Sequence, residues 1–255
     1  MIIESRNNPL IKRVRALTSS KARHEQGLHL LENEKLVRDA IDSGAPICDV
    51  FVEEGLSCEN LPIPENAHVY TVTRSVLESI TESRTPQGWA ATVLTPDTTP
   101  PAQYPEGLIV VLDGVQDPGN VGAILRSADA FGAVGMLLSQ TCADPFSPKS
   151  IRAAMGSTYH LPVWQADAAT ELTRLRGSGY TALCGHLRGI EELPPLSSRT
   201  VLVIGSEGSG VSEAVSQQCT LYRLPMFGRT ESLNAAVAAG VLLYVVRAAI
   251  GRPLI

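Results

Sequence analysis

The second half of the sequence predicts a doubly wound α/β domain built around a parallel sheet. Residues 108–113 form a continuous apolar run, Leu-Ile-Val-Val-Leu-Asp, which is typical of a central parallel strand because both faces of such a strand are covered. Strand-like and helical segments then alternate along the chain, as they do where helices connect parallel strands. Three strand-like runs end in glycine turns, within residues 114–126, 201–210 and 224–234. Ligands bind at such strand ends, so we expect the three turns to form one composite site.

The first half predicts a smaller α/β domain, residues 1–94. Ile11, Val14 and Leu17 recur at helical spacing, and Gly44 with Pro46 marks the end of a later helix. The expected elements are a helix to about Glu25, a strand at 28–31, a helix at 34–43, strands at 50–52 and 68–72, a helix at 73–79 and a strand at 89–93.

A polar run with four prolines separates the two domains. It covers residues 95–107, Thr-Pro-Asp-Thr-Thr-Pro-Pro-Ala-Gln-Tyr-Pro-Glu-Gly. Proline lacks a backbone donor and fixes φ, so this run cannot continue a helix or a central strand. We expect an interdomain linker here, followed by the larger domain over residues 108–255.

The larger domain continues the alternation after its first strand. Gly132 ends a helix that begins near Val121. The expected elements are helices at 121–131, 147–155 and 211–217, strands at 134–139, 180–184, 200–204 and 221–224, and a long last helix from Ser232.

That last helix is rich in Ala, Val and Leu over residues 233–250. It is short for the hydrocarbon thickness of a membrane, and it carries Asn234 and Arg247 near its ends. We expect it to be buried on nearly all sides, at the centre of the fold or at a subunit interface, in a soluble protein.

The charge is distributed unevenly along the chain. The net charge is −5, but basic residues gather near the N-terminus, where they could lie along a phosphate backbone. A solvated helix face without a partner would look the same. The predicted RNA-binding residues are Arg6, Lys12, Arg13, Arg15, Lys21 and Arg23.

Cysteine usage indicates a cytoplasmic protein. The five cysteines are scattered, odd in number and never at C-x-x-C spacing, so neither a zinc site nor a disulfide framework is indicated. The N-terminal residues also lack the apolar core of a signal peptide.

Each glycine turn, taken by itself, is weak evidence for a cofactor-binding site. Residues 205–210, Gly-Ser-Glu-Gly-Ser-Gly, lack the Gly-Lys-Ser/Thr ending of a phosphate loop, and residues 119–122 lack dinucleotide-binding spacing. Together, the residues resemble the three motifs of the SpoU (TrmH) family of S-adenosylmethionine-dependent RNA 2′-O-ribose methyltransferases. The motifs are Asp117-Pro-Gly-Asn-Val-Gly-Ala-Ile-Leu-Arg-Ser-Ala128, Ile204-Gly-Ser-Glu-Gly-Ser-Gly210, and Leu224-Pro-Met226 with Glu231-Ser-Leu-Asn-Ala-Ala-Val-Ala238.

The N-terminal domain is similar to the L30e-like substrate-binding domain that many family members carry. The similarity rests on Ser5-Arg-Asn-Asn-Pro-Leu-Ile-Lys12 and Thr85-Pro-Gln-Gly88. Asn33 departs from the pattern, because relatives usually have glycine after the preceding glutamate.

The resemblance implies a fold and partners. It implies a Rossmann-like parallel-sheet methyltransferase domain over residues 108–255, ending in the deep trefoil knot of the SPOUT superfamily. It also implies S-adenosylmethionine as methyl donor, an RNA substrate, and a homodimer with helix 233–250 at or near the interface. No metal is expected, given the cysteine spacing.

The resemblance also assigns residues. Transfer to a ribose hydroxyl needs alignment of donor and acceptor and help with a proton. Main-chain groups of the donor site would bind adenine and ribose, with Met226 packing on adenine. The predicted catalytic residues are Asn120, Arg126, Glu207, Ser232 and Asn234, and the predicted donor-binding residues are Ile204, Gly205, Leu224, Met226, Ser232 and Leu233.

Arg126 has three alternative roles. The resemblance assigns it to activation of the 2′-hydroxyl, although a guanidinium is a poor base. Holding the adjacent phosphate and stabilising developing alkoxide charge is the second role. The third is a structural ion pair with Asp113 or Asp129.

The predicted function is therefore 2′-O-methylation of a ribose in structured RNA, with 23S-type ribosomal RNA as the first expectation. Transfer RNA is the closest alternative, and a resistance methyltransferase acting on ribosomal RNA is another. The remaining alternatives are a non-catalytic RNA-binding module, a ring-nitrogen methyltransferase and a nucleotide-binding oxidoreductase.

Overall fold

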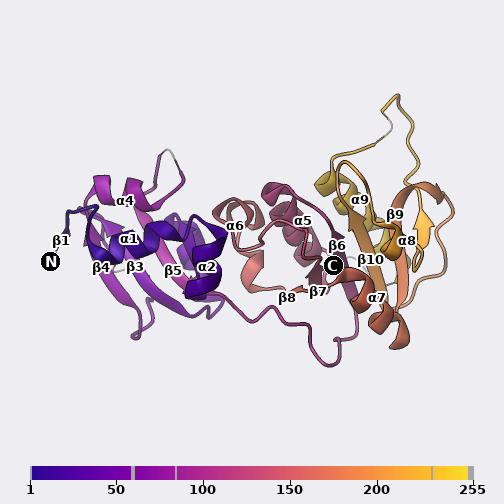
Figure 1. Ribbon diagram of the computed structural model, residues 1–255, viewed down its shortest axis with the longest axis horizontal. Helices are drawn as coiled ribbons and strands as arrows, with labels where there is room; N and C mark the ends of the chain where they lie inside the picture. The colour runs from indigo at the N-terminus through magenta and orange to yellow at the C-terminus, as the bar shows by residue number, and fades with distance from the viewer. Residues whose placement is uncertain (1, 59–60, 84, 231, 252–255) are drawn as a thin grey trace. The chain divides into compact units, whose positions relative to one another are not determined.

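The chain divides into two compact units in a computed structural model, which describes residues 2–58, 61–83, 85–230 and 232–251 (Figure 1). Unit 1 comprises Met1–Pro96 and Phe146–Tyr159, and unit 2 comprises Asp97–Pro145 and His160–Ile255. Two findings differ from the sequence-based boundaries: residues 97–107 belong to unit 2, and a segment from the middle of the chain belongs to unit 1.

Unit 1 is built on a mixed sheet of order β1-β4-β3-β5-β2. β3 and β4 are parallel, whereas β5 runs antiparallel to β2 and β3. The predicted strands are all present, and the short β1 was not predicted. The strands are β1 (Ile2–Ile3), β2 (Leu28–Glu32), β3 (Ile47–Glu53), β4 (His68–Val72) and β5 (Trp89–Leu94).

The helices of unit 1 follow the predicted ones with one difference. The basic helix expected up to about Glu25 is two helices, α1 and α2, because Ser19 accepts a hydrogen bond from the amide of Ala22 through Oγ at 3.3 Å and caps a new helix. The helices are α1 (Pro9–Ala16), α2 (Ser20–Gln26), α3 (Glu34–Asp42), α4 (Arg74–Ile80) and, from the inserted segment, α6 (Pro148–Ala154).

Asn33 caps α3 from a backbone conformation that glycine prefers. Its φ is 92° and its ψ is 154°, and its Oδ1 accepts a hydrogen bond from the amide of Leu36 at 2.9 Å. A non-glycine residue in this region costs about 1–3 kcal/mol. This strain gives a physical reason for the glycine that the family resemblance leads one to expect at this position.

Asn33→Gly is therefore expected to raise the free energy of unfolding by about 1 kcal/mol. Relief of about 1–3 kcal/mol of strain exceeds the loss of a few tenths of a kcal/mol when glycine replaces an asparagine cap, together with about 0.5–1 kcal/mol of glycine entropy. Denaturant unfolding measures the change. The control is Asn8→Gly, because Asn8 caps α1 at an ordinary φ of −53° and should lose stability when replaced. Equal losses in both variants would contradict the interpretation.

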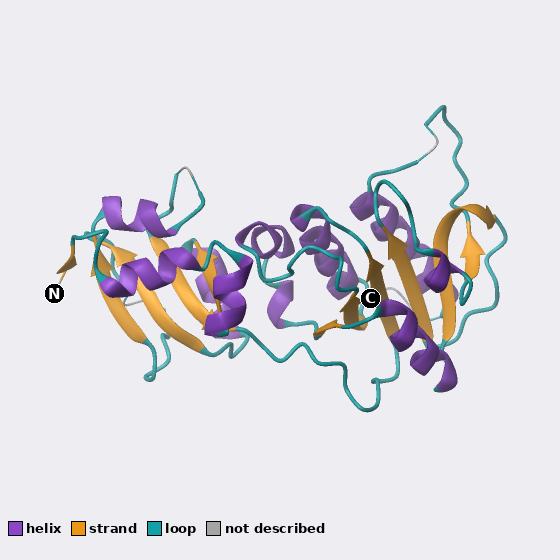
Figure 2. Cartoon of the chain, in the orientation of Figure 1, coloured by secondary structure: helices purple, strands orange, loops and turns teal. Residues whose placement is uncertain are grey.

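Unit 2 confirms the predicted parallel α/β fold (Figure 2). Its sheet has the order β11-β9-β10-β6-β7-β8, and all its pairs are parallel. The threading that a trefoil knot requires remains a prediction. The strands are β6 (Leu108–Asp113), β7 (Ala133–Leu138), β8 (Val163–Gln165), β9 (Thr181–Ile190), β10 (Thr200–Gly205) and β11 (Thr220–Tyr222).

The helices of unit 2 cover both faces of this sheet. Alternate residues of the strands point to opposite faces; one face packs against α7 and α8, whereas α5 and α9 pack against each other. The fully buried Val121, Ile124 and Leu125 anchor α5, each contributing about 1.5–3 kcal/mol by burial. The sequence-based assignment missed β8 and α7. The helices are α5 (Pro118–Ala130), α7 (Ala168–Gly177), α8 (Glu213–Ser216) and α9 (Ala235–Ala249).

The proline-rich run is packed against unit 2. The guanidinium of Arg174 donates to the carbonyls of Pro101 and Ala102 at 2.7 and 3.1 Å. The hydroxyl of Tyr104 donates to Glu171 Oε2 at 2.6 Å, and its ring lies edge-on to Trp164. The prolines exclude regular structure, but they do not prevent packing, so residues 97–107 form a strap on unit 2.

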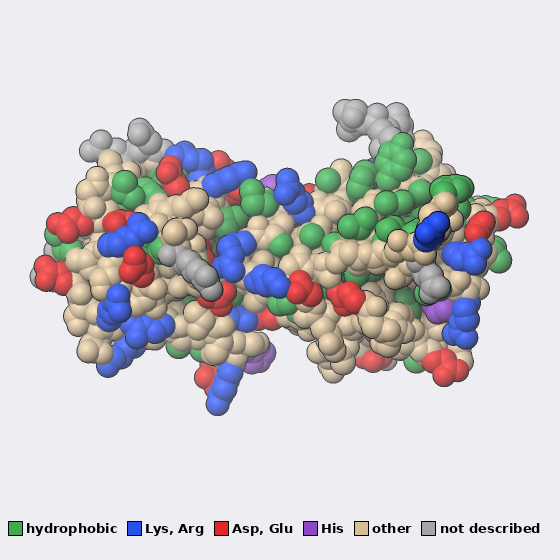
Figure 3. Space-filling view, turned by 90° about the horizontal axis from the view of Figure 1, so that it is seen from above, with side chains coloured by type: hydrophobic (Ala, Val, Ile, Leu, Met, Phe, Trp, Pro, Cys, Tyr) green, Lys and Arg blue, Asp and Glu red, His purple; other side chains and the backbone are tan. Residues whose placement is uncertain are grey.

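Within the single chain α9 is buried on one face only, so the predicted burial on nearly all sides would require a subunit interface. Ala239, Leu242, Leu243 and Val246 are buried, whereas the opposite face is exposed. Val237, Val241 and Tyr244 are 53%, 42% and 51% exposed. Figure 3 shows exposed hydrophobic side chains gathered on one side of unit 2. Among the described residues, no helix has the length and hydropathy needed to cross a membrane.

Candidate functional site

Asn120 joins all three glycine-bearing loops. Asp117 caps α5 by accepting from the amide of Asn120 at 3.0 Å, which holds Asn120 in the first turn. Its Nδ2 donates to Glu207 Oε1, and its Oδ1 accepts from Asn234 Nδ2 at 3.1 Å. The structure thus brings Asn120, Glu207 and Asn234 together, one from each predicted motif.

The loop that carries Glu207 is a tight turn closed by its own groups. Ser206 and Gly210 pair through their backbones, and Ser206 Oγ accepts from the amide of Ser209 at 3.1 Å. A Cβ at Gly205 would lie 2.3 Å from the carbonyl carbon of Gly210, so this position requires glycine. The turn therefore presents exposed backbone beside Glu207.

Polar residues at the strand ends hold the loops, and the sequence-based site missed them. Asp113 Oδ2 accepts from the amide of Ser212 at 2.7 Å, which ties the loop after β6 to the chain after β10. Ser139 Oγ accepts from the amide of Gly114 at 3.0 Å. A polar residue at the end of a buried strand, as at Asp113, or directly after one, as at Ser139, is a signal that could have identified both.

The third loop leaves its main chain free to bind a ligand. Within the described residues, the backbone groups of 224–230 and of Ser232 and Leu233 make no hydrogen bond with protein. Asn234 then caps α9 by accepting from the amides of Ala236 and Val237 at 2.9 and 3.3 Å. The predicted Met226 is 38% exposed, so its thioether is available to a ligand. Glu231 lies outside the described residues.

These features fit the predicted methyl donor. The free backbone at Leu224, Met226 and Leu233 offers donors and acceptors suited to an adenine and a ribose. Gly205 leaves the end of β10 without a side chain. A cavity of about 620 Å³ lies elsewhere in unit 2, and none of the predicted donor-binding residues lines it. It is lined by Arg188, Val211, Glu213, Ser216, Gln217 and Leu221.

Arg126 is not brought into this cluster. It lies six residues after Asn120 on α5, about 240° further around the helix axis, and its side chain is exposed. In the described part of the chain it makes no hydrogen bond or ion pair. Asp113 accepts from Ser212, and Asp129 pairs with His160 at 3.1 Å, so the structural ion pairs considered for Arg126 are not formed.

The predicted RNA-binding arginines are largely engaged within unit 1. Arg13 pairs with the buried Asp49 at 3.4 Å. Arg6 and Arg15 donate to the carbonyls of Ser75 and Ser79 at 2.9 and 3.0 Å. Their side chains hold α1 and the residues before it against neighbouring elements, which leaves less of each guanidinium for phosphate.

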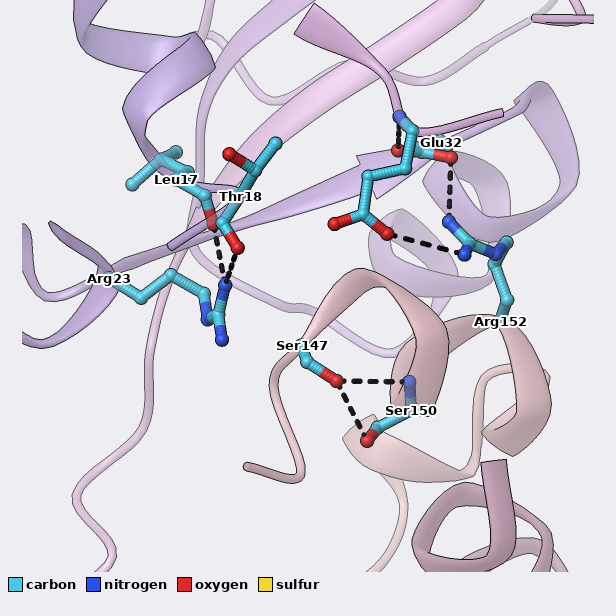
Figure 4. Close-up of polar contacts among 8 residues, drawn as sticks. Leu17, Thr18, Arg23, Glu32, Ser147, Ser150 and Arg152 are labelled. Carbon is cyan, nitrogen blue, oxygen red and sulfur yellow. Dashed lines mark hydrogen bonds and ion pairs between the residues drawn. The ribbon is translucent and has the colours of Figure 1, made fainter. Parts of the chain in front are cut away.

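For Arg23, the structure corrects the prediction of an RNA-binding role. It is 6% exposed, and its Nη1 donates to the carbonyls of Leu17 and Thr18 at 2.7 and 2.9 Å (Figure 4). These bonds satisfy backbone groups where α1 ends. Arg23 is therefore a structural residue, and the two lysines of the set, Lys12 and Lys21, remain exposed.

Among the described residues, no side chains are arranged as a metal site. In the part of the chain that the structure describes, no group of three His, Cys, Asp or Glu side chains is placed to hold a metal ion. Burial raises the pKa of the Cys142 thiol. A hydrogen bond with Cys219, and then burial, raises the pKa of the Cys184 thiol. These thiols therefore stay protonated at neutral pH.

Two family models match the chain. Residues 107–244 match the SpoU rRNA Methylase family, and residues 8–91 match the MRM3-like substrate binding domain. The two matches fall on either side of the proline-rich strap.

Known proteins resemble the chain over nearly its whole length. It is 31% identical to the 23S rRNA (guanosine(2553)-2′-O)-methyltransferase RlmP of Bacillus subtilis, covering 96% of this chain and 98% of that protein. The crystal structure of an AdoMet-bound rRNA methyltransferase from Sinorhizobium meliloti matches with a TM-score of 0.86 and 31% identity, covering 97% of each chain. The AdoMet complex of the SpoU methyltransferase AviRb from Streptomyces viridochromogenes matches with a TM-score of 0.83 and 26% identity, covering 95% of this chain and 98% of that one.

Proposed function

The chain belongs to the SpoU rRNA methylase family, and from this premise we propose that its substrate is a ribose 2′-hydroxyl in 23S-type ribosomal RNA. The chain is an S-adenosylmethionine-dependent RNA methyltransferase. The ribosomal target is supported by the relatives and by the substrate-binding domain match. The observation that carries the proposal is the contact of Asn120 with both Glu207 and Asn234 across the three motif loops. A cytoplasmic location follows from such a substrate.

The bound donor supplies an electrophilic methyl group on a sulfonium. We assign its binding to main-chain groups at Ile204, Gly205, Leu224, Ser232 and Leu233, with Met226 beside the adenine. The free backbone of the third loop supports this assignment. Asn120, Glu207 and Asn234 fix the three loops relative to one another, so the donor and the acceptor hydroxyl can be aligned.

Arg126 acts on the acceptor in this proposal. Its exposed guanidinium, without a partner among the described residues, is available to a phosphate of the RNA. Placed there, it would stabilise the negative charge that develops on the ribose oxygen as the hydroxyl loses its proton, before this oxygen takes the methyl group from the sulfonium sulfur. Its high pKa makes this role chemically easier than proton abstraction.

We also propose that two copies associate through α9. Its exposed face carries Val237, Val241 and Tyr244, which leaves apolar surface uncovered in one protomer. Symmetric dimers bury such self-complementary patches.

Val241→Asp is expected to convert the dimer to monomers. Each interface would bury two unpaired carboxylates, which should weaken association roughly a hundredfold or more. Light scattering after size-exclusion chromatography measures the mass. Leu187→Asp is the control, because Leu187 is 61% exposed on β9, outside the proposed interface. An unchanged mass for Val241→Asp would exclude this interface.

Transfer of labelled methyl from S-adenosylmethionine to separated ribosomal and transfer RNA tests the substrate. The expected result is label in ribosomal RNA at a linkage that resists alkaline cleavage, because a 2′-O-methyl group blocks that reaction. Label confined to transfer RNA would overturn the ribosomal substrate and keep the chemistry. Label on a base would indicate a ring-nitrogen enzyme. Donor binding without transfer, also on ribosomal assembly intermediates, would indicate a non-catalytic RNA-binding module.

A further inference from the structure

A segment of the methyltransferase part of the chain completes the core of unit 1. Phe146–Tyr159 belongs to unit 1, although the residues on both sides of it belong to unit 2. Ile151, on α6, is 1% exposed and lies in the apolar cluster of unit 1 with Leu36 and Val37. The substrate-binding unit is therefore not made from the N-terminal residues alone.

A buried histidine holds the end of this segment. His29, on β2, is fully buried, and its Nε2 lies 2.9 Å from the hydroxyl of Tyr159. Its Nδ1 lies 3.2 Å from Thr95 Oγ1, and the ring of Phe146 lies 5.3 Å away between centroids. Both ends of the segment thus contact one side chain of the central sheet of unit 1.

A buried carboxylate of unit 1 binds the middle of the segment Phe146–Tyr159. Glu32 is 4% exposed, and its Oε2 accepts from Arg152 Nη1 at 2.9 Å (Figure 4). Its Oε1 accepts from the amide of Glu82 at 2.5 Å, and Arg152 also contacts the Glu82 carboxylate at 3.4 Å. A charge this deeply buried needs its partner, so Arg152 fastens the segment more strongly than an exposed ion pair would.

The chain that leads into the segment is bonded to the loop of the first motif. The amide of Ala143 donates to the carbonyl of Val115 at 2.9 Å, and Cys142 Sγ donates to the carbonyl of Leu112 at 3.3 Å. Ser139 accepts from Gly114 in the same loop. Only two residues, Asp144 and Pro145, separate this bonded stretch from Phe146, where the segment of unit 1 begins.

We propose that Phe146–Tyr159 transmits RNA binding in unit 1 to the loop of residues 114–120, and that Arg152 is a positioning residue for methyl transfer. RNA held by unit 1 would keep this loop where Asn120 meets Glu207 and Asn234. Close-packed elements move as units rather than deform smoothly. A segment that is fixed in the core of unit 1 can therefore restrict the positions of the loop to which it is joined. The inference rests on the proposed function, because it requires RNA in unit 1 and transfer at the Asn120 cluster.

The test compares Arg152→Met with the double variant Glu32→Gln/Arg152→Met in the full chain. The melting temperature, donor affinity and single-turnover methylation rate at saturating RNA are measured for each. Arg152→Met should lose stability and transfer roughly tenfold more slowly. Its donor affinity, measured without RNA, should stay within about twofold of wild type, because the contacts of Asn120 with Glu207 and Asn234 lie within unit 2 and are unchanged. The double variant should recover stability, since no buried charge is left unpaired and Gln still accepts from Glu82, but not the rate.

Matched variants separate positioning from folding. Arg38→Met removes an exposed ion pair of the same unit, Arg38–Glu34 at 3.1 Å, and should retain the wild-type rate. Tyr159→Phe removes only the hydroxyl beside His29 and gives a milder variant if Arg152→Met fails to fold; it should also lower the rate.

If the double variant recovers its rate together with its stability, Arg152 is only a structural residue and the proposal is overturned. Wild-type methylation rates in all variants would overturn it as well. A wild-type protein that binds the donor but methylates no RNA would instead overturn the proposed function.

Discussion

Arg126→Ala is expected to lower the rate of methyl transfer by about 10²–10³-fold, the typical effect of removing one group that stabilises developing negative charge. The folded state should be nearly unaffected, because the exposed side chain has no partner among the described residues. Single-turnover methylation and thermal unfolding measure the two effects. Arg176→Ala removes another exposed arginine of unit 2, on α7, and should retain full activity.

Arg126→Lys distinguishes the two chemical roles. A lysine retains the charge but lacks the planar fork, so a phosphate clamp predicts partial activity with an unchanged pH profile. A proton acceptor predicts a profile shifted toward lower pH, because a lysine amine loses its proton more readily than a guanidinium does. Wild-type activity in Arg126→Ala would remove this residue from the mechanism.

Asn120→Ala is expected to produce the second largest loss, about a hundredfold in transfer rate. It removes the hydrogen bonds to Glu207 and Asn234 at once, and a bond to a charged group contributes about 1.5–3 kcal/mol. Donor affinity should fall with the rate, since the three loops no longer hold one another. Gln116→Ala, an exposed neighbour on the same loop, is the matched control. Retained donor affinity and rate would show that the loops are held by other contacts.

Asn120→Asp adds a pH dependence with a definite sign. A carboxyl beside Glu207 raises the pKa of one member of the pair, because two like charges at this separation repel each other. Below that raised pKa one proton is shared and a hydrogen bond persists; above it the pair repels. The activity of the variant relative to wild type should therefore fall as the pH rises through that raised pKa. A constant ratio would contradict this account.

The sequence predicted elements best where strong local patterns bound them. The apolar run of β6 and the strand His68–Val72 match the predicted ranges, and the three motif loops meet as expected. The three-residue β8 was missed because so short a strand leaves no periodicity to detect. The strap of residues 97–107 was taken for a linker because proline content reports the absence of regular structure and not the absence of packing.

Contacts between residues that are far apart in the sequence could not be predicted from local patterns. Glu32 and Arg152 are 120 positions apart, and no local pattern relates them. The role of each basic residue near the N-terminus likewise depends on which hydrogen-bond acceptors the fold brings near it. Arg23 finds two carbonyls at a helix end, whereas Lys12 stays exposed, and composition treats both as the same positive charge.

The placement of Phe146–Tyr159 also sets the order in which the protein can mature during synthesis. The N-terminal ninety-six residues leave the ribosome well before α6 does. During that interval His29 lacks its contact with Tyr159, and Glu32 lacks its ion pair with Arg152. Domains usually fold in the order in which they are made. Here the first domain cannot finish before the second is partly translated, and a nascent chain arrested before residue 146 would display an open, protease-sensitive first domain.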